Sequence, residues 1–291
     1  GRTTLVSGNS GVGKSTLMNA LVGEKLSIIT SKAQTTRHRI LGIVNGDDFQ
    51  IVFSDTPGIL KPCYKLQESM MNFVRGALSD ADVLLYVTDT VERDDERAAE
   101  IIDRIRQSGV PTLVVVNKID LTTQEALEAL VEKWRATLPD AEIIPISARE
   151  GFNIAGLFDR ILALLPEGEP FYPKDTLTDK TLRFFASEII REKILRNYDK
   201  EIPYSCEIEI EEYREEPGID RISAVIYVAR NSQKGILIGH KGEKLKKVGR
   251  QAREELEEFL RKKVFLQLFV KVSEDWRNDQ RQLRRFGYDP Q

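Results

Sequence analysis

One short stretch near the start of the chain constrains its fold more than any other. Residues 8–15 read Gly-Asn-Ser-Gly-Val-Gly-Lys-Ser, the pattern G-x-x-x-x-G-K-S, between the apolar pair Leu5-Val6 and a helix-like segment, 16–21. Glycines let consecutive backbone N–H groups turn inward around an anion at the positive end of a helix. This loop between a strand and a helix is typical of nucleotide-binding α/β sheets, so we expect it to bind phosphates.

The side chains of this loop indicate how the phosphates would be held. Lys14 is expected to reach the β- and γ-phosphates, and the Ser15 hydroxyl to bind Mg²⁺, a cation that prefers oxygen ligands. The alternative is a chance glycine-rich turn, which the flanking strand and helix disfavour. The nucleotide-binding residues predicted here are Asn9, Ser10, Gly11, Val12, Gly13, Lys14, Ser15 and Thr16.

Composition narrows the class of protein. The chain has 291 residues, of which 41% are hydrophobic and 31% charged, enough for two globular domains with separate cores. No apolar run approaches the roughly 20 residues that would cross a bilayer, and we expect a cytoplasmic chain without a signal peptide. Cys63 and Cys206 lack C-x-x-C spacing, so neither a disulfide nor a zinc site is expected. The net charge of −3 is summed over the whole chain, so it does not exclude a local basic patch that binds nucleic acid.

A polar segment after the first helix is a candidate for sensing the γ-phosphate. Residues 31–39 show no apolar periodicity and are predicted to form a loop. In a nucleotide switch such a loop supplies a threonine whose hydroxyl and N–H reach Mg²⁺ and the γ-phosphate. Thr36 is our candidate, and Thr35 is the alternative.

The apolar strand 50–54 ends in Asp55-Thr56-Pro57-Gly58. A carboxylate at the end of such a strand lies beside the phosphate loop, where Asp55 would hold a water of the magnesium shell. The N–H of Gly58 would donate to the γ-phosphate. We therefore assign Ser15, Thr36 and Asp55 to the metal. Lys14, Thr36 and Gly58 are assigned to catalysis.

Two later strand ends predict which base is selected. Residues 83–89 and 112–116 are almost continuously apolar, as in a parallel sheet covered by helices on both faces. The second of these strands runs into Asn117-Lys118-Ile119-Asp120, and the strand 142–146 runs into Ser147-Ala148. An aspartate accepts from both N1–H and the amine of guanine, a donor pair that adenine lacks. The N–H of Ala148 would donate to guanine O6. The residues predicted to bind the base are Asn117, Lys118, Asp120, Ser147 and Ala148.

Prolines and glycine between 165 and 173 end the first half of the chain and predict a stiff connection. We predict a nucleotide-binding domain at 1–168, a linker at 169–175 and a second domain at 176–291.

The second domain is predicted to begin with an amphipathic helix near Leu182, with its charged residues facing solvent: Arg191, Glu192, Lys193 and Arg196. Alternation in 205–211 places Cys206, Ile208 and Ile210 on the buried face of a strand. Strands are also predicted at 222–228 and 264–272.

Gly239-His240-Lys241-Gly242 lies between an apolar segment and a helix rich in lysine and arginine. A G-x-x-G turn between two helices is typical of KH domains, which clamp the backbone of single-stranded RNA. The basic residues gather at one end of the following helix, which favours a phosphate-facing end over the alternative of an ordinary solvated face. The predicted RNA-binding residues are Ile238, Gly239, His240, Lys241, Gly242, Lys244, Lys247 and Arg250.

In order and spacing, the motifs of the first half resemble the translation-factor class of small GTPases. With the α-β-β-α-α-β pattern of the second half, the whole chain resembles the Era family of bacterial ribosome-assembly GTPases. The resemblance implies an α/β P-loop GTPase domain with a mostly parallel sheet and helices on both faces. An α+β type II KH domain would follow it. It also implies binding of GTP, GDP and Mg²⁺, and binding of small-subunit (16S) ribosomal RNA near its 3′ end on the 30S subunit. We expect a monomer, with peripheral association at the inner membrane as an open question.

At two positions this chain lacks a side chain that assists GTP hydrolysis in related GTPases. Where some small GTPases place a water-orienting glutamine, this chain has Ile59, so slow intrinsic hydrolysis is expected. Era-like loops usually carry an asparagine in place of Gly11, and its loss puts stimulation by potassium in question. A non-cycling, structural RNA-binding protein is therefore the alternative function. An ATPase or kinase is disfavoured by Asp120, and a tandem GTPase by the single G-x-x-x-x-G-K-S pattern.

Overall fold

The computed structural model describes residues 2–8, 12–23, 36–58, 63–91 and 98–288. Contacts divide the chain into two compact units. The first unit comprises Gly1–Cys63 and Met70–Asp179, and the second comprises Tyr64–Ser69 and Lys180–Gln291. Each unit has its own sheet and its own core, as expected for a chain of this length.

The first unit is built on a six-stranded sheet with the order β2-β3-β1-β4-β5-β6. All neighbouring strands run parallel except β2, which is antiparallel to β3. The mostly parallel sheet predicted from sequence is confirmed. Its strands are β1 (Arg2–Gly8), β2 (Ile40–Asn45), β3 (Gln50–Asp55), β4 (Val83–Asp89), β5 (Thr112–Asn117) and β6 (Glu142–Pro145).

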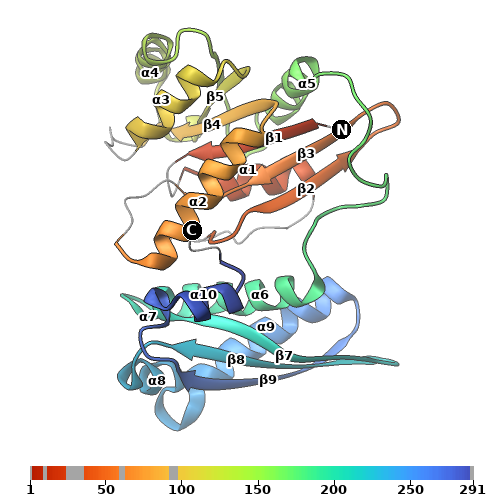
Figure 1. The fold of residues 1–291 in the computed structure, drawn as a ribbon, viewed down its shortest axis with the longest axis vertical. Helices are drawn as coiled ribbons and strands as arrows, with labels where there is room; N and C mark the ends of the chain where they lie inside the picture. The colour runs from red at the N-terminus through yellow and green to blue at the C-terminus, as the bar shows by residue number, and fades with distance from the viewer. Residues whose placement is uncertain (1, 9–11, 24–35, 59–62, 92–97, 289–291) are drawn as a thin grey trace. The chain divides into compact units, whose positions relative to one another are not determined.

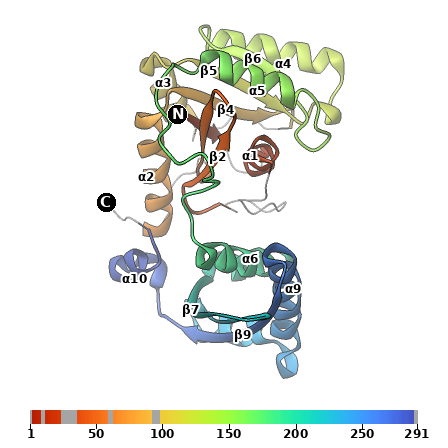
Figure 2. The ribbon, with the colours of Figure 1, turned by 90° about the vertical axis from the view of Figure 1, so that its right-hand side faces the viewer.

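Helices cover both faces of this sheet (Figures 1 and 2), with α1 and α5 on one face and α2 and α3 on the other. Every residue of β3, β4 and β5 is buried, because strands with helices on both faces have no solvent-facing side. The helices are α1 (Lys14–Val22), α2 (Lys65–Asp80), α3 (Ala99–Ser108), α4 (Gln124–Thr137) and α5 (Ile154–Leu164), with a 3₁₀ turn, η2, at Ile119–Leu121.

The proline-containing segment after α5 follows the edge of the first unit. The backbone N–H of Ile43 in β2 donates to the Leu177 carbonyl at 2.8 Å, and the Gln50 amide donates to the Tyr172 carbonyl at 2.8 Å. The unit therefore extends to Asp179, a few residues beyond the linker expected at 169–175. Extended backbone beside an edge strand satisfies polar groups that the edge would otherwise expose.

The second unit is an α+β fold on a three-stranded sheet, β7-β8-β9. β7 and β8 form an antiparallel pair, and β9 lies parallel to β8. Helices α6 and α9 contact one another and lie over one face of this sheet (Figure 2). The elements are α6 (Leu182–Asn197), α7 (Ile202–Ser205), β7 (Glu207–Glu216), β8 (Ile219–Val228), α8 (Asn231–Ile238), η3 (His240–Gly242), α9 (Glu243–Leu260), β9 (Lys263–Val272), η4 (Trp276–Asn278) and α10 (Gln280–Arg285).

The core of the second unit confirms the alternation read from residues 205–211. Cys206, Ile208 and Ile210 are all buried and pack in the same cluster as Ile190 and Ile194 of α6. A strand with one face against helices requires apolar residues at every second position, which this segment provides.

The prediction that the charged residues of α6 face solvent was wrong for three of them. Arg191, Glu192 and Lys193 are buried, whereas the Arg196 side chain is half exposed. Burial of these charges is compensated by pairing. Arg191 bonds Glu188 at 2.9 Å, and Lys193 bonds Glu192 and Glu255 of α9 at 2.9 Å each. Charged residues on a helix facing another helix are buried when partners of opposite sign face them.

Among the described residues, no helix is both long enough and apolar enough to span a membrane.

Candidate functional sites

The first residues of α1 close the predicted phosphate loop. Gly13 has φ 92°, a left-handed conformation that favours glycine, and a Cβ there would lie 2.4 Å from Nδ2 of Asn117. Lys14, the first residue of the helix, is buried, and Ser15 and Thr16 are partly buried. Asn9, Ser10 and Gly11 lie outside the described residues. A helix N-terminus is an end at which an anion can bind, because the first-turn N–H groups lack acceptors within the helix.

The side-chain oxygens assigned to the metal come together next to this helix start. Oγ of Ser15 lies 2.9 Å from Oγ1 of Thr36, and it donates to Oδ2 of Asp55 at 3.3 Å. Asp55 is fully buried at the end of β3, and Thr36 is 7% exposed. Two hydroxyls and a carboxylate are ligands of the type that Mg²⁺ prefers, so these residues fit the metal. Thr35, the alternative to Thr36, lies outside the described residues.

The segment after Asp55 is held against the first strand of the sheet. The Thr56 hydroxyl donates to the carbonyl of Val6 at 3.2 Å, and the following residues to Gly58 are buried. These contacts bring the backbone of Gly58 to the same edge of the sheet as the metal-type oxygens, because β1 and β3 are parallel neighbours. Ile59 lies outside the described residues.

Asn117 links the phosphate loop to the segments predicted to select the base. Its amide donates to the Val12 carbonyl at 2.9 Å, and its Oδ1 accepts from the Ala148 N–H at 3.0 Å. Asn117 is buried, so both hydrogen bonds are shielded from water. One side chain therefore keeps the two halves of the nucleotide site in register.

Asp120 and Ser147 are joined by a hydrogen bond in the region predicted to select the base. The Ser147 hydroxyl donates to Oδ1 of Asp120 at 2.9 Å. Asp120 itself is exposed, which leaves its carboxylate accessible to a ligand. A carboxylate oriented by a neighbouring hydroxyl is arranged to accept hydrogen bonds in one direction, as discrimination between bases requires.

Sequence reasoning missed two residues next to this region, Asp89 and Thr90. The Asp89 carboxylate lies 2.7 Å from Nζ of Lys118, and the Thr90 hydroxyl donates to the Lys118 carbonyl at 2.8 Å. The available signal was the position of Asp89 at the end of an apolar strand, the same signal that pointed to Asp55.

In the second unit, the predicted RNA-binding residues lie on a helix–turn–helix. Gly239, between α8 and α9, has φ 75°, and a Cβ there would lie 2.8 Å from Cβ of Lys244. Lys241 and Gly242 also have left-handed backbones, with φ 52° and 73°. Ile238 packs against the core, whereas the basic residues of the turn and α9 are exposed: His240, Lys241, Lys244, Lys247 and Arg250. The turn thus presents charge to solvent on a fixed backbone.

Tyr198 packs beside this turn and contacts residues on both sides of it. It is buried, its hydroxyl donates to the Leu237 carbonyl, and Nζ of Lys244 lies 5.5 Å from the centre of its ring. Burial raises the pKa of Tyr198 to about 12, so the hydroxyl keeps its proton for this hydrogen bond. The aromatic ring gives the Lys244 ammonium a favourable position near the turn.

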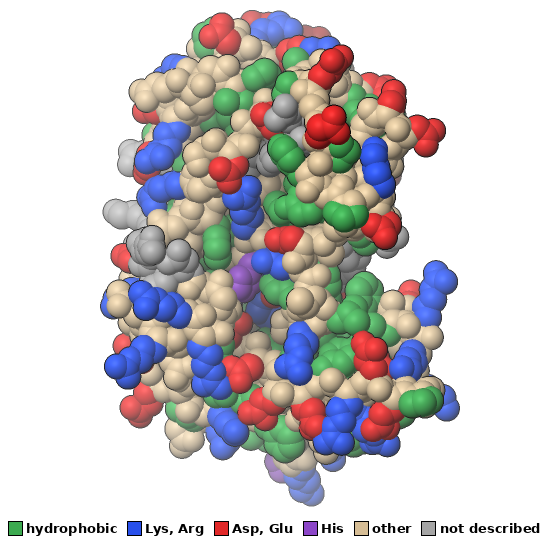
Figure 3. Space-filling model, turned by 45° about the vertical axis from the view of Figure 1, so that its right-hand side comes forward, with side chains coloured by type: hydrophobic (Ala, Val, Ile, Leu, Met, Phe, Trp, Pro, Cys, Tyr) green, Lys and Arg blue, Asp and Glu red, His purple; other side chains and the backbone are tan. Residues whose placement is uncertain are grey.

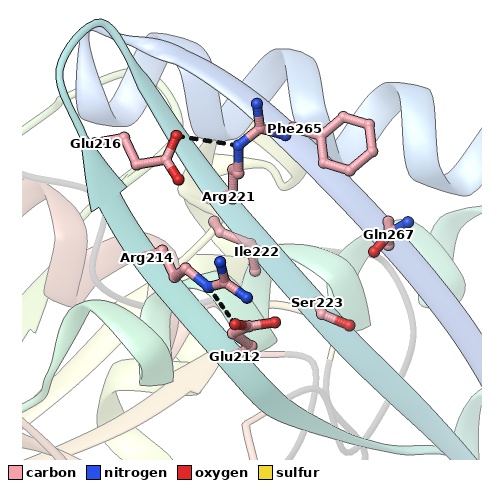
Figure 4. A pocket seen from close by; sticks show the side chains of 8 residues that line it. All are labelled: Glu212, Arg214, Glu216, Arg221, Ile222, Ser223, Phe265 and Gln267. Atoms are coloured by element: carbon pink, nitrogen blue, oxygen red, sulfur yellow. Dashed lines mark hydrogen bonds and ion pairs between the residues drawn. The ribbon is translucent and has the colours of Figure 1, made fainter.

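A shallow cavity on the sheet of the second unit contains none of the predicted residues (Figure 4). Arg221 lies between Glu216, 3.1 Å away, and the ring of Phe265, 5.4 Å away. Arg214 forms an ion pair with Glu212. The charges lining this cavity balance, so it lacks the excess positive charge that a phosphate backbone attracts. Lys and Arg are also interspersed with Asp and Glu across the face shown in Figure 3.

Comparisons with known proteins match both units of the chain. Residues 3–118 match the family described as 50S ribosome-binding GTPase, and residues 201–277 match the KH domain family. GTPase Era of Syntrophus aciditrophicus is 45% identical over 97% of this chain and 93% of its own length. GTPase Era of Alkaliphilus metalliredigens is 43% identical over 97% of this chain and 96% of its own length.

Two solved structures are also similar. The crystal structure of a variant of Aquifex aeolicus Era bound to GDP·AlF4⁻ has 41% identity and a TM-score of 0.94, covering 99% of this chain and 98% of that one. A crystal structure of Era in complex with MgGDPNP and nucleotides 1506–1542 of 16S ribosomal RNA matches with the same identity, TM-score and coverage.

Fold and sites define the class: a P-loop GTPase with a KH domain, which binds and hydrolyses GTP with Mg²⁺ and binds RNA. Within that class the chain belongs to the Era family of GTPases.

Proposed function

We propose that Ser15, Thr36 and Asp55 hold Mg²⁺ and that Lys14 holds the β- and γ-phosphates. The observation that carries this assignment is the oxygen cluster of Ser15, Thr36 and Asp55 beside the N-terminus of α1. The ion, when bound, neutralises charge on the β- and γ-phosphate oxygens. Asp55 is the only member of the cluster with a charge, and its burial strengthens its interaction with a cation.

Thr36 and Gly58 are proposed to respond to the γ-phosphate. Their N–H groups would bond to it in the GTP state and lose those bonds after hydrolysis, which would release the segments that contain them. With Ile59 in place of a water-orienting glutamine, the side chain after Gly58 cannot accept or donate a hydrogen bond, and we expect slow intrinsic hydrolysis.

The guanine base is proposed to bind between Asp120 and Ala148. Asp120 would accept from N1–H and the exocyclic amine, and the Ala148 N–H would donate to O6. Asn117 connects this region to the phosphate loop: its amide donates to the Val12 carbonyl, and its Oδ1 accepts from the Ala148 N–H, a bond that guanine O6 would replace.

The second unit, called the KH unit from here on, is proposed to bind small-subunit ribosomal RNA near its 3′ end and to assist assembly of the 30S subunit. A related Era, 41% identical to this chain, was crystallised with MgGDPNP and nucleotides 1506–1542 of 16S ribosomal RNA. In this chain, the exposed His240, Lys241 and Lys244 beside a rigid G-x-x-G turn are suited to the RNA backbone. We propose that nucleotide state controls this binding.

The alternative, a structural RNA-binding protein that does not hydrolyse GTP, is not favoured, because a related Era binds GDP·AlF4⁻. We propose a GTPase domain at 1–168, a linker at 169–175 and a KH domain at 176–291 as the functional division, with the linker and the residues up to Asp179 packed against the first unit. A cytoplasmic monomer is proposed as well, and its peripheral association with the inner membrane is a separate hypothesis.

Single-turnover GTP hydrolysis at a series of Mg²⁺ concentrations tests the metal assignment. Ser15→Ala should raise the Mg²⁺ concentration needed for half-maximal rate by about tenfold or more, as expected when one charge-assisted ligand is lost. Ser79→Ala is the matched control, because the Ser79 hydroxyl is exposed and bonds only a local carbonyl. The same Mg²⁺ dependence in all three proteins would contradict the assignment.

A further inference from the structure

The end of β4 lies directly beside the start of the base-selecting segment. In the parallel register of β4 and β5, Asp89 is the partner of Asn117. The backbone N–H of Thr90 donates to the Asn117 carbonyl at 3.2 Å. Asp89 and Thr90 are therefore the nearest neighbours of the Asn117-Lys118 pair on the adjoining strand.

These two residues hold Lys118 at its side chain and at its main chain. Oδ2 of Asp89 lies 2.7 Å from Nζ of Lys118, and the Asp89 side chain is only 4% exposed. Oδ1 of the same carboxylate accepts from the Val91 N–H at 3.0 Å, which fixes the carboxylate. The Thr90 hydroxyl donates to the Lys118 carbonyl at 2.8 Å.

Lys118 needs such support because its backbone is left-handed, with φ 63° and ψ 35°. Residues with a Cβ rarely adopt this conformation, and it persists where the surrounding structure holds it. The 3₁₀ turn that carries Asp120, Ile119–Leu121, begins immediately after Lys118. The direction of Asp120 thus depends on the backbone at Lys118.

We infer that Asp89 and Thr90 are positioning residues for guanine recognition. By holding the left-handed turn at Lys118, they direct Asp120 toward N1 and the exocyclic amine of the base. This role rests on the proposed guanine site and deepens it, because it places part of the base specificity on the end of β4 and the residue after it.

Inosine triphosphate provides the probe, since inosine keeps N1–H and O6 but lacks the exocyclic amine. Binding of non-hydrolysable analogues of GTP and ITP to the full chain with Mg²⁺ should be measured by calorimetry. In the unaltered protein the ITP analogue should bind about tenfold or more weakly, since one hydrogen bond to a charged group is lost. Equal affinities in that protein would refute the proposed guanine site itself.

Thr90→Val removes the hydroxyl and keeps the side-chain shape. The ratio of ITP to GTP dissociation constants should fall at least about threefold, because a misdirected Asp120 loses its bond to the amine first. Thr90→Ser keeps the hydroxyl and should restore the ratio. Asp89→Asn, which keeps an oxygen for the Val91 N–H and removes the charge, should also lower the ratio.

Thr137→Val is the matched control, because the Thr137 hydroxyl also donates to a carbonyl, that of Lys133, outside the nucleotide site. It should leave the ratio unchanged. If Thr90→Val weakens both analogues equally, or weakens neither, while the unaltered protein discriminates, Asp89 and Thr90 have only a structural role and the inference is wrong. Should Asp89→Asn fail to fold, the Thr90→Val and Thr90→Ser pair decides the matter.

Discussion

The two binding regions of this chain are built in opposite ways. In the nucleotide site, the main contacts join residues that are far apart in sequence, such as Ser15 with Asp55 or Val12 with Asn117. The KH element is contiguous, running from Ile238 to Arg250, and its basic residues are exposed. The first site depends on the mutual register of several buried strand ends. The second depends on a backbone turn and on charge.

This difference predicts how each region responds to substitution. Hydrogen bonds in buried surroundings are strong and directional, so a single changed atom in the nucleotide site should alter specificity. Contacts between exposed cations and phosphates are set largely by counterion release, so the KH element should respond to charge and salt. Each substitution below should therefore affect only one of the two regions, and an effect on both would contradict this difference.

The largest effect is expected for Asp120→Asn. This change should weaken GTP by about 3–6 kcal/mol, since two hydrogen bonds to a charged group are lost. Xanthosine triphosphate should gain affinity, because its 2-oxo group can accept from the new amide. Equilibrium binding of both nucleotides measures the switch, with Asp140→Asn, at an exposed position, as the control. Unchanged preference for GTP would show that the base lies elsewhere.

A smaller effect is expected for the pair His240→Asp and Lys241→Asp. Two carboxylates against the RNA backbone should weaken RNA binding by about 2–4 kcal/mol and leave GTP affinity in the absence of RNA unchanged. Lys133→Asp with Thr137→Asp on α4 makes the same change in net charge and is the control. If both pairs lower RNA affinity equally, only the overall charge of the protein matters and the KH turn is not the interface.

The smallest effect is expected for Gly239→Ala, which combines backbone strain with crowding at the G-x-x-G turn. Gly239→Ala should lower the free energy of unfolding of the KH unit by about 1–3 kcal/mol, because φ 75° is strained for alanine and its Cβ would lie 2.8 Å from Cβ of Lys244. Gly218→Ala is a close match, with φ 81° and open space around it, so it reports strain alone. Chemical denaturation followed by tryptophan fluorescence measures both. Equal losses would mean that crowding at Lys244 has no cost.

Much of the nucleotide site could be predicted from sequence because its residues follow apolar strands. Parallel strands end at one edge of the sheet, so Asp55 and Asn117 had to approach the phosphate loop. Asp89 also lies at the end of an apolar strand, but the contact that it and Thr90 make with Lys118 depends on the register of β4 and β5. Sequence order does not determine that register.

The KH unit shows a second limit of sequence reasoning. The G-x-x-G turn was readable because left-handed backbones favour glycine, and Gly239 and Gly242 have them. The burial of Arg191, Glu192 and Lys193 was not readable, because it depends on Glu188 in the same helix and Glu255 in α9. A charged residue looks solvent-facing until its partner on another helix is known.

Control of RNA binding by the nucleotide state connects the two regions, and it can be tested by comparing RNA affinities between nucleotide states. The affinity for an RNA of small-subunit 3′-end sequence should be determined with GTP analogue, with GDP and without nucleotide, at one fixed salt concentration. We expect RNA to bind more tightly with the GTP analogue than with GDP, by about 1–3 kcal/mol, and GTP affinity to rise by the same amount when RNA is bound. Equal RNA affinities in all three states would mean that the GTPase and KH units act independently, and would contradict the claim.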